Sequence, residues 1–534
     1  MGLMILGAFP VPAVAPSMVE EVPRTDLHWT QYHRYDNITQ QLRDLDSRYP
    51  DLVKLESMGK SWHQRDLWVL KISDMADMDD PEEPDVLVVG PHHGNEYIGV
   101  EVVWLVINYL LENYQVDPRV TWLVDNREIW VVPFMNPDAH DYNFESGQSF
   151  RKNLRDNDGD MATVRDNSFG VDLNRNYPFH WDSLHDGDIT GGNSRFSRRS
   201  SMYAGPKDNY DDDGDSILTF INRGLRVDED WVDNLDNDGD GLVDEDPDGG
   251  FSEPETRALR DLIQRDPYRN NINFTVYVDF HSYSGLVLYP WGYTSQPCAD
   301  AETLQLIGER MAELSNYTAM QGYDLYQTNG DSLDWIYGKE GILCYTVEIG
   351  KEQHVPPPEE IPYHTWNNLG STLYLAEVAK DPRGVTEASQ QWLAPEPYDG
   401  WNAQVRVSTM VPPEQLKEGA VSVHYRVGDG PYSTIKMYRG PDGYYSTSIY
   451  PDQKGTMEYF FTAETLSGNQ LSYPGPVETI DVEVTSEFVS SQGISMGLLA
   501  LSMLFFLGLI WGGFAFTVQM AIRADRKKKA AGVI

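Results

Sequence analysis

Two short apolar runs that end at metal-binding side chains constrain the fold of this chain most strongly. The first spans residues 85–90 and leads to His93 and Glu96, and the second spans residues 273–280 and ends directly at His281. Apolar runs of this length bounded by turns predict buried strands. Side chains that follow neighbouring strands lie where open α/β sheets place their sites. Two imidazoles and one carboxylate leave one position of a catalytic zinc open for water, so we predict that His93, Glu96 and His281 bind zinc.

A His-x-x-Glu pair alone is weak evidence, because it arises often by chance in polar turns. Further motifs follow this pair in a defined order along the chain. They are Arg-Lys-Asn-Leu-Arg at 151–155, Gly-Val-Asp-Leu-Asn-Arg-Asn-Tyr at 170–177, His-Ser-Tyr-Ser at 281–284, Leu-Tyr-Gln at 325–327 before Asp-Trp at 334–335, and Tyr-Thr-Val-Glu at 345–348. In content and order this set resembles the zinc carboxypeptidases of the carboxypeptidase A and T type, the M14 metallopeptidases, over about residues 32–378.

Zinc chemistry of this kind needs a nearby carboxylate and a fixed positive charge. Zinc lowers the pKa of a bound water, and a carboxylate beside that water can act as general base. Glu348 ends the apolar run 342–347, where a buried carboxylate needs a reason, with a core ion pair as the alternative. The resemblance implies that Glu348 is the catalytic glutamate. Arg155 is preferred over Arg151 as the group that stabilises the oxyanion, and Asn95 stands where many family members carry an arginine.

The resemblance also implies a binding site for the C-terminal residue of a peptide. Asn174 and Arg175 match the pair that binds the terminal carboxylate, since a guanidinium can form two parallel hydrogen bonds with it. Tyr326 matches a mobile tyrosine that closes over this carboxylate. Leu333 occupies the position at the base of the specificity pocket and indicates apolar or aromatic C-terminal residues. Asp331 could instead accept a Lys or Arg side chain, so mixed specificity stays open.

A strongly acidic segment interrupts the enzyme-like region. Residues 205–250 hold sixteen Asp or Glu and three Lys or Arg, a net charge of −13. Within it, Asp236, Asp238, Asp240 and Asp244 repeat the opening ligand spacing of a calcium loop. The twelfth position of that loop is Pro247, where an EF-hand has a bidentate glutamate. We expect bound calcium in this segment, with a solvated acidic loop as the alternative.

Both ends of the chain indicate a membrane-anchored protein whose enzyme-like region lies outside the cytoplasm. Residues 488–522 carry no charged side chain, and 493–522 are long enough to span a bilayer. The basic tail 523–534 that follows predicts a cytoplasmic C-terminus. Residues 1–24 are predicted as a signal segment, although the basic residues that usually begin one are missing.

The composition excludes one class of partner. The chain has 83 acidic and 41 basic side chains, a net charge of −42, which excludes nucleic acid as a natural partner.

The remaining sequence predicts two folded domains. Residues 25–385 alternate strand-like runs with helical patterns, which predicts an α/β domain with a mixed sheet. Residues 396–486 contain alternating strands separated by Gly-Asp-Gly and Pro-Asp-Gly turns, and predict a small β-sandwich of immunoglobulin-like or fibronectin-like kind. This second domain carries no set of catalytic residues, so a spacer is the simplest role for it.

The sequence therefore predicts a membrane-anchored zinc carboxypeptidase that acts on peptides and proteins with a free C-terminus. Two alternatives stay open. One is a related zinc amide hydrolase that acts on cell-wall peptides. The other is a non-catalytic, calcium-dependent binding or adhesion protein, in which the zinc ligands and Glu348 would have no use.

Overall fold

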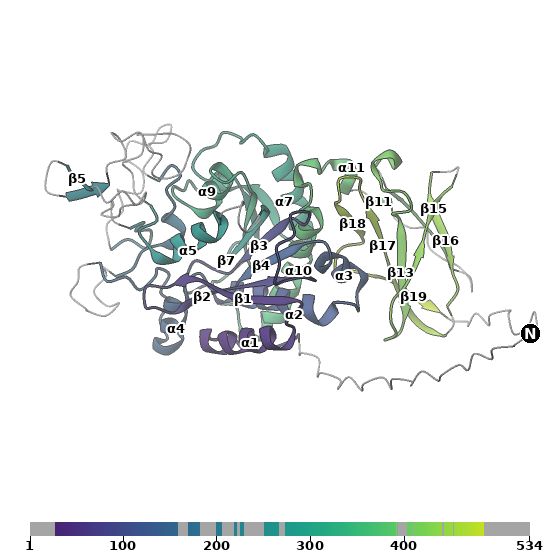
Figure 1. The fold of residues 1–534 in the computed structure, drawn as a ribbon, viewed down its shortest axis with the longest axis horizontal. Coiled ribbons are helices and arrows are strands. Elements are labelled where there is room, and N and C mark those ends of the chain that lie inside the picture. The colour runs from purple at the N-terminus through teal and green to yellow at the C-terminus, as the bar shows by residue number, and fades with distance from the viewer. Residues whose placement is uncertain are drawn as a thin grey trace, which may run out of the picture. The chain divides into compact units, whose positions relative to one another are not determined.

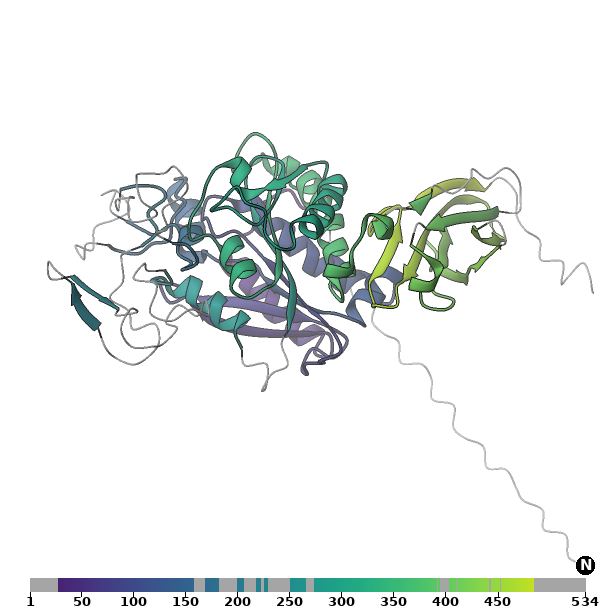
Figure 2. The same cartoon turned by 90° about the horizontal axis from the view of Figure 1, so that it is seen from above.

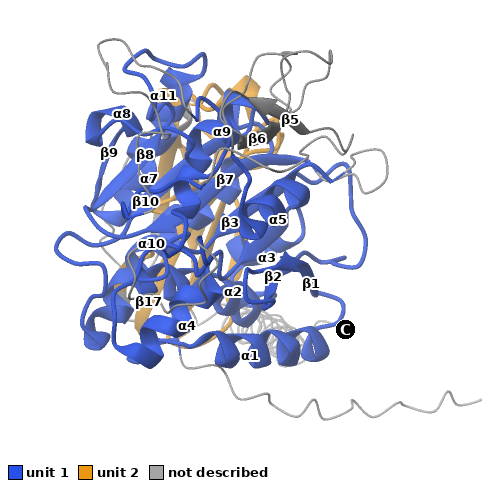
Figure 3. Ribbon diagram, turned by 90° about the vertical axis from the view of Figure 1, so that its left-hand side faces the viewer, with its two compact units in different colours: residues 1–383 blue, residues 384–534 orange. Residues whose placement is uncertain are grey.

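The computed structural model describes residues 27–157, 169–181, 199–205, 218–221, 225–228, 250–265, 273–390, 392–393, 403–409, 411–440, 443–451 and 453–484 (Figure 1). The chain divides into two compact units, residues 1–383 and 384–534, coloured blue and orange in Figure 3. The predicted zinc ligands, Glu348 and the predicted substrate-binding residues all lie in the first unit.

A mixed eight-stranded sheet forms the centre of the first unit. Its strands are β1 (Val53–Lys60), β2 (Asp66–Ile72), β3 (Asp85–Val89), β4 (Glu128–Val132), β7 (Phe274–His281), β8 (Leu286–Tyr289), β9 (Thr318–Gln321) and β10 (Leu343–Glu348). Their order across the sheet is β1-β2-β4-β3-β7-β10-β8-β9. The central strands β4, β3, β7 and β10 run parallel, whereas β1, β2 and β8 pair with their inner neighbours in antiparallel fashion.

Helices cover both faces of this sheet (Figures 1 and 2). They are α1 (Tyr35–Arg48), α2 (Tyr97–Asn113), α3 (Pro118–Val124), α4 (Pro137–Ser146), α5 (Pro254–Ile263), α7 (Ala301–Ser315), α8 (Gly322–Leu325), α9 (Ser332–Gly338) and α10 (Ile361–Val378). Helix α10 packs against α2 and α7, whereas α5 contacts β1 and α9 contacts β10. The prediction of an α/β domain with a mixed sheet is confirmed.

The burial of the central strands explains their composition. Every residue of β3 and β4 is buried, and β7 is buried from Val276 to His281. Strands covered by helices on both faces read as continuous apolar runs instead of alternating ones. The two runs that the sequence marks as strands therefore became β3 and β7, which lie side by side.

The second unit contains two sheets that share one core. The first sheet consists of β11 (Trp392–Leu393), β12 (Ala403–Thr409), β15 (Tyr438–Arg439) and β16 (Tyr445–Ile449). The second consists of β13 (Ser422–Val427), β14 (Ser433–Lys436), β17 (Gly455–Glu464), β18 (Gln470–Tyr473) and β19 (Ile480–Val484), shown in green to yellow in Figure 2. Val407 and Ile449 of the first sheet pack in the same buried cluster as Val423 and Phe461 of the second. This arrangement agrees with a β-sandwich, and its finer fold type stays a prediction.

Several predicted features fall on other parts of the chain. Residues 1–24, the four aspartates predicted to bind calcium, and the predicted span 493–522 lie outside the described residues. Within the acidic segment a two-stranded hairpin is described, β5 (Leu218–Ile221) and β6 (Leu225–Asp228). Among the residues that the structure describes, no helix has the length and hydropathy needed to cross a membrane.

Candidate active site

The carboxyl ends of three parallel strands bring the predicted zinc ligands and Glu348 together. His93 and Glu96 follow β3, His281 is the last residue of β7, and Glu348 is the last residue of β10. Strand β7 pairs with β3 on one side and with β10 on the other, and the register places Glu348 beside His281. Parallel neighbours end at one edge of a sheet, so residues far apart in sequence meet there.

The loop between β3 and α2 needs a glycine to hold its two ligands in place. A side chain at Gly94 would bring its Cβ atom to 2.3 Å from Cβ of Ala139, at the start of α4. The backbone N–H of Gly94 also donates to the carbonyl of Arg151 at 2.9 Å. The loop is thereby clamped between α4 and the segment at Arg151, and His93 and Glu96 on either side of the glycine point to His281.

Three donor atoms converge at this point in the geometry of a metal site. Nδ1 of His93 lies 2.8 Å from Oε1 of Glu96 and 2.9 Å from Nδ1 of His281. Nδ1 of His281 lies 2.9 Å from Oε2 of Glu96. All three side chains are buried, and a metal ligand must bind through an unprotonated nitrogen. His93, Glu96 and His281 form one of the groups in the described part of the chain that could hold a metal ion.

Two carboxylates behind the histidines set the protonation that a metal requires. Oδ1 of Asp172 lies 3.1 Å from Nε2 of His93, and Oδ2 of Asp279 lies 3.5 Å from Nε2 of His281. A carboxylate at Nε2 holds the proton there and leaves the lone pair of Nδ1 for the metal. The residues therefore fit a zinc ion. Neither aspartate was predicted from the sequence, although Asp172 lies in the 170–177 motif and Asp279 lies two residues before His281, where strand alternation turns it to the same face.

The electrostatics of the site favour a cation. Burial opposes ionisation of Glu96, but His93 and His281 outweigh it and hold the pKa of Glu96 well below its usual value. Burial also disfavours a charged His281, yet Glu96 and Asp279 raise its pKa well above the usual range. Asp172 shows the same balance, since Arg151 and His93 overcome burial and lower its pKa. A buried cluster with this excess of carboxylates attracts positive charge, which a divalent ion supplies.

Glu348 lies beside this cluster and lines a pocket next to it. Burial raises the pKa of Glu348 to about 7, with His281 acting in the opposite direction and Glu96 in the same direction. A carboxyl group whose pKa lies near neutrality can both accept and donate a proton at physiological pH. The alternative role, a core ion pair, has no support, because no ion pair of Glu348 occurs within the described residues.

The predicted substrate-binding residues line the pocket that Glu348 borders. Asn174 and Arg175 lie in a short 3-10 helix, Leu173–Arg175, and line the pocket together with Tyr326. Nη2 of Arg175 donates to the hydroxyl of Tyr326 at 3.1 Å, and Arg175 is buried. Tyr326 is 47% exposed, so its ring is not fixed by packing. The structure therefore places a buried guanidinium and an exposed phenol at the same end of the pocket.

Leu333 and Asp331 both line the same pocket, but they differ in what their side chains offer to a substrate. Leu333 presents an apolar side chain from α9. The carboxylate of Asp331 is engaged: one oxygen accepts the backbone N–H of Asp334 at 2.9 Å, as the N-cap of α9, and the other accepts the hydroxyl of Thr328. Burial raises the pKa of Asp331, which weakens it further as a partner for a cationic side chain.

The structure places Arg151, and not the predicted Arg155, beside the predicted metal ligands. Nη1 of Arg155 pairs with Oε1 of Glu253 at 2.6 Å, and its guanidinium lies 5.1 Å from the ring centre of Trp62. Arg151 instead lies at the metal ligands, with Nε 3.0 Å from Oδ2 of Asp172 and Nη1 3.5 Å from Oε1 of Glu96. The sequence Arg-Lys-Asn-Leu-Arg offers two arginines, and only the packing around them decides which one reaches the site.

The cluster that holds Arg155 leads to a prediction on the pH dependence of stability. Glu255 is fully buried, and burial together with the charge of Glu253 raises its pKa from 4.5 to about 8. The folded chain therefore binds a proton there that the unfolded chain has lost above its own pKa, so this group stabilises the fold at low pH and the contribution is lost as pH rises to 8. Glu255→Gln imitates the protonated acid at every pH.

We expect the melting temperature of Glu255→Gln to exceed that of the unmodified chain by a margin that grows between pH 5 and pH 9. The pKa difference between the usual 4.5 and the raised value of about 8 corresponds to roughly 5 kcal/mol in the free energy of unfolding. Thermal unfolding at both pH values measures it. A constant difference between the two proteins across this range would contradict a protonated Glu255.

The fold and the candidate metal site agree with the family that the sequence motifs resemble, and a comparison with known protein families gives the same result. Residues 38–369 match the sequence model of the zinc carboxypeptidase family, which is more than half of the 534 residues. The chain belongs to the zinc carboxypeptidase family, and the resemblance read from its motifs is confirmed.

Individual relatives show the extent of the similarity. A zinc carboxypeptidase of Saccharothrix mutabilis subsp. capreolus is 29% identical over 345 residues, covering 61% of this chain and 64% of the relative. Carboxypeptidase B of Astacus astacus is 28% identical over 333 residues, covering 60% of this chain and 88% of the relative. Among solved structures, thrombin activatable fibrinolysis inhibitor aligns with a TM-score of 0.51 at 23% identity, over 68% of this chain and 78% of that chain. This last likeness shows a common fold, and the chain spans less than two thirds of the Saccharothrix protein.

Proposed function

We propose that this protein is a zinc metallocarboxypeptidase that hydrolyses the C-terminal peptide bond of peptides and proteins. One observation carries the proposal: a single pocket is bordered by Glu348, beside the metal ligands, and by the buried guanidinium of Arg175 with Tyr326. A guanidinium held in a fixed position binds a terminal carboxylate through two hydrogen bonds and so sets the last peptide bond at the reacting groups.

The residues then have distinct tasks. A zinc ion bound by His93, Glu96 and His281 supplies a Lewis acid and lowers the pKa of a water molecule. Glu348 takes a proton from the attacking water and passes it to the leaving amine. Arg151 supplies positive charge near the oxygen of the scissile carbonyl, a role that we assign to it because of its position beside Glu96.

We infer a preference for apolar or aromatic C-terminal residues. Leu333 supports this preference because its side chain lines the pocket. Asp331 offers little to a Lys or Arg side chain, since both of its oxygens already accept hydrogen bonds. A buried acceptor that is already satisfied gains less from a new donor than an unpaired one.

The test of the function is mass spectrometry of a peptide mixture incubated with the zinc-loaded full chain, with and without a zinc chelator. We expect ladders that lose residues from the C-terminus, only without chelator, and faster for peptides ending in Phe or Leu than in Lys or Arg. Internal cleavage, or release of amide-linked groups from cell-wall peptides alone, would favour the related amide hydrolase. Bound zinc without any cleavage would favour the non-catalytic binding protein.

The expected location and the calcium site extend this proposal. The uncharged run 488–522 and the basic residues after it support a single membrane anchor with the enzyme outside and the tail in the cytoplasm. Fractionation of the full chain and of a chain ending at residue 487 tests the anchor, which is wrong if both stay with the soluble fraction.

The spacing of Asp236, Asp238, Asp240 and Asp244 supports calcium binding. An unchanged melting temperature on addition of calcium would leave them as solvated acidic groups.

A further inference from the structure

The carboxylate of Asp279 is a buried negative charge that the proposed mechanism does not use. Asp279 belongs to β7, two residues before His281, and is 0% exposed. Neutral side chains donate to it from three directions: Oδ1 accepts the hydroxyl of Thr346 at 2.6 Å, and Oδ2 accepts those of Ser332 at 2.9 Å and Tyr277 at 3.1 Å. A buried charge persists only when such partners replace water, so the fold is built around this carboxylate.

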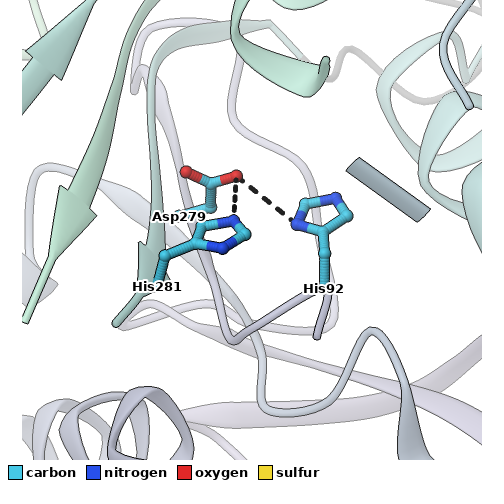
Figure 4. A group of neighbouring side chains, drawn as sticks. All are labelled: His92, Asp279 and His281. Atoms are coloured by element: carbon cyan, nitrogen blue, oxygen red, sulfur yellow. Dashed lines mark ion pairs between the residues drawn. The ribbon is translucent and has the colours of Figure 1, made fainter. Parts of the chain in front are cut away.

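One side of Asp279 faces the predicted zinc ligand His281 and the neighbouring His92. Figure 4 shows one of its oxygens directed at the rings of both His92 and His281. Oδ2 lies 3.4 Å from Nδ1 of His92 and 3.5 Å from Nε2 of His281, and the two rings stack with their centres 5.5 Å apart and 8° between their planes. His92 is held in turn by the hydroxyl of Tyr177, 2.7 Å from its Nε2. The ring of His281 is therefore fixed along one face and at one edge.

The other side of Asp279 faces the peptide-binding pocket. The backbone N–H of Ser332 donates to Oδ1 of Asn174 at 2.9 Å, and the Ser332 hydroxyl lies between two acceptors, 3.0 Å from this Oδ1 and 2.9 Å from Oδ2 of Asp279. Thr346, which donates to the other oxygen of Asp279, lines the pocket beside Glu348. One carboxylate thus connects a zinc ligand on β7 with Asn174 and with the pocket wall on β10.

We propose that Asp279 is a positioning residue that holds the zinc ligand His281 and the pocket residues Asn174 and Thr346 in one fixed arrangement. The inference rests on the proposed function for its effect on peptides, but its effect on zinc binding does not depend on catalysis. A carboxylate hydrogen-bonded to a ligand histidine orients the ring and increases its basicity, and loss of such a partner typically costs 10–100-fold in metal affinity or activity.

The same atoms could in principle form a second metal site, since His92, Asp279 and His281 also lie within reach of one ion. Two facts favour the positioning role. Oδ2 of Asp279 accepts hydroxyl groups from Ser332 and Tyr277, and an ion bound to this oxygen would compete with both donors. His281 would also have to give up the protons of both ring nitrogens to serve two metals at once, whereas its contact with Asp279, 3.5 Å from Nε2, is compatible with a proton on that nitrogen.

The experiment compares Asp279→Asn with Asp85→Asn, which replaces another buried aspartate on the neighbouring strand β3. Asp85 is buried as well, and accepts Nε1–H of Trp130 at 2.6 Å and the N–H of Asn273 at 2.5 Å, at the start of its strand and away from His93. Zinc affinity is measured by competition with a chelator in the absence of peptide, together with the number of metal ions bound per chain. We expect Asp279→Asn to lower zinc affinity by about 10–100-fold. Asp85→Asn should leave it unchanged within about twofold.

A second variant tests the pocket side and remains informative if Asp279→Asn does not fold. Ser332→Ala removes the hydroxyl that joins Asp279 to the Asn174 segment but leaves the backbone N–H in place. We expect it to raise KM for peptides with a free C-terminus by about 3–10-fold while zinc affinity stays unchanged.

Equal zinc affinity in Asp279→Asn and Asp85→Asn, or an unchanged KM in Ser332→Ala, would overturn the proposal. So would two zinc ions per chain that fall to one in Asp279→Asn, because the aspartate would then be a ligand itself. If the unmodified chain binds zinc but cleaves no peptide, the proposed function fails. The zinc measurement still decides the role of Asp279 in that case.

Discussion

Replacing Glu348 by glutamine should lower kcat by about 10³-fold, within the range that general acid–base catalysis contributes. The amide has nearly the same shape as the carboxylate but cannot accept the proton of the attacking water. Glu348 is not one of the three side chains whose donor atoms converge at the metal site, so zinc content should stay at the level of the unmodified protein. Turnover of a peptide with a free C-terminus and metal analysis of the same sample measure both effects.

Glu340→Gln is the matched control for this change. Glu340 lies before β10 and accepts a hydrogen bond from Gln264 at 2.9 Å on the exposed surface. Its replacement should leave kcat unchanged. Activity of Glu348→Gln within tenfold of the unmodified protein would remove Glu348 as the general base, whatever the control shows.

Arg175→Ala should reduce kcat/KM for peptides with a free C-terminal carboxylate by about 10²–10³-fold, because loss of one partner from a buried, hydrogen-bonded charge pair costs roughly 2–5 kcal/mol. Arg175 is 2% exposed and donates to the carbonyl of Asn174 and to the hydroxyl of Tyr326. Water cannot readily replace a guanidinium held at this depth. The measurement is kcat/KM for one peptide in two forms, with a free and with an amidated C-terminus.

The amidated peptide is the internal control for the role of Arg175. It has no negative charge for the guanidinium to bind, so any slow cleavage of it should change little in Arg175→Ala. Arg175→Lys should recover part of the lost activity, because it restores the charge without the two parallel hydrogen bonds. Equal losses on both peptides would mean that Arg175 supports the fold of the site and does not bind the terminal carboxylate.

The strand pattern explains why so much of the site could be predicted. His93, Glu96, His281 and Glu348 each follow or end a continuous apolar run, and such runs become central strands of the sheet. Once the strands are parallel and adjacent, their carboxyl ends must lie together. Local order in the sequence was therefore enough to predict three residues that the structure brings together as a candidate metal site, and the candidate base beside them.

The choice between Arg151 and Arg155 shows where local order fails. Both arginines belong to one short motif, and a turn can direct either of them to the site. Which arginine reaches the site depends on Glu253, which lies almost one hundred residues later. Its Oε1 pairs with Nη1 of Arg155 at 2.6 Å and holds that side chain away from the predicted metal ligands. The partners of Asp279 are equally distant, since His92, Ser332 and Thr346 reach it from three other segments.

The sequence by itself determined the class of fold, the family and the residues whose donor atoms converge at the candidate metal site, because these depend on the hydrophobic pattern and on residue types at strand ends. Only the tertiary structure decided which arginine lies beside the predicted metal ligands, whether Asp331 is available to a substrate, and that Asp172 and Asp279 lie next to Nε2 of His93 and of His281. Each of these outcomes is a competition for hydrogen-bond and ion-pair partners, and the partners are known only when segments distant in the chain have packed together.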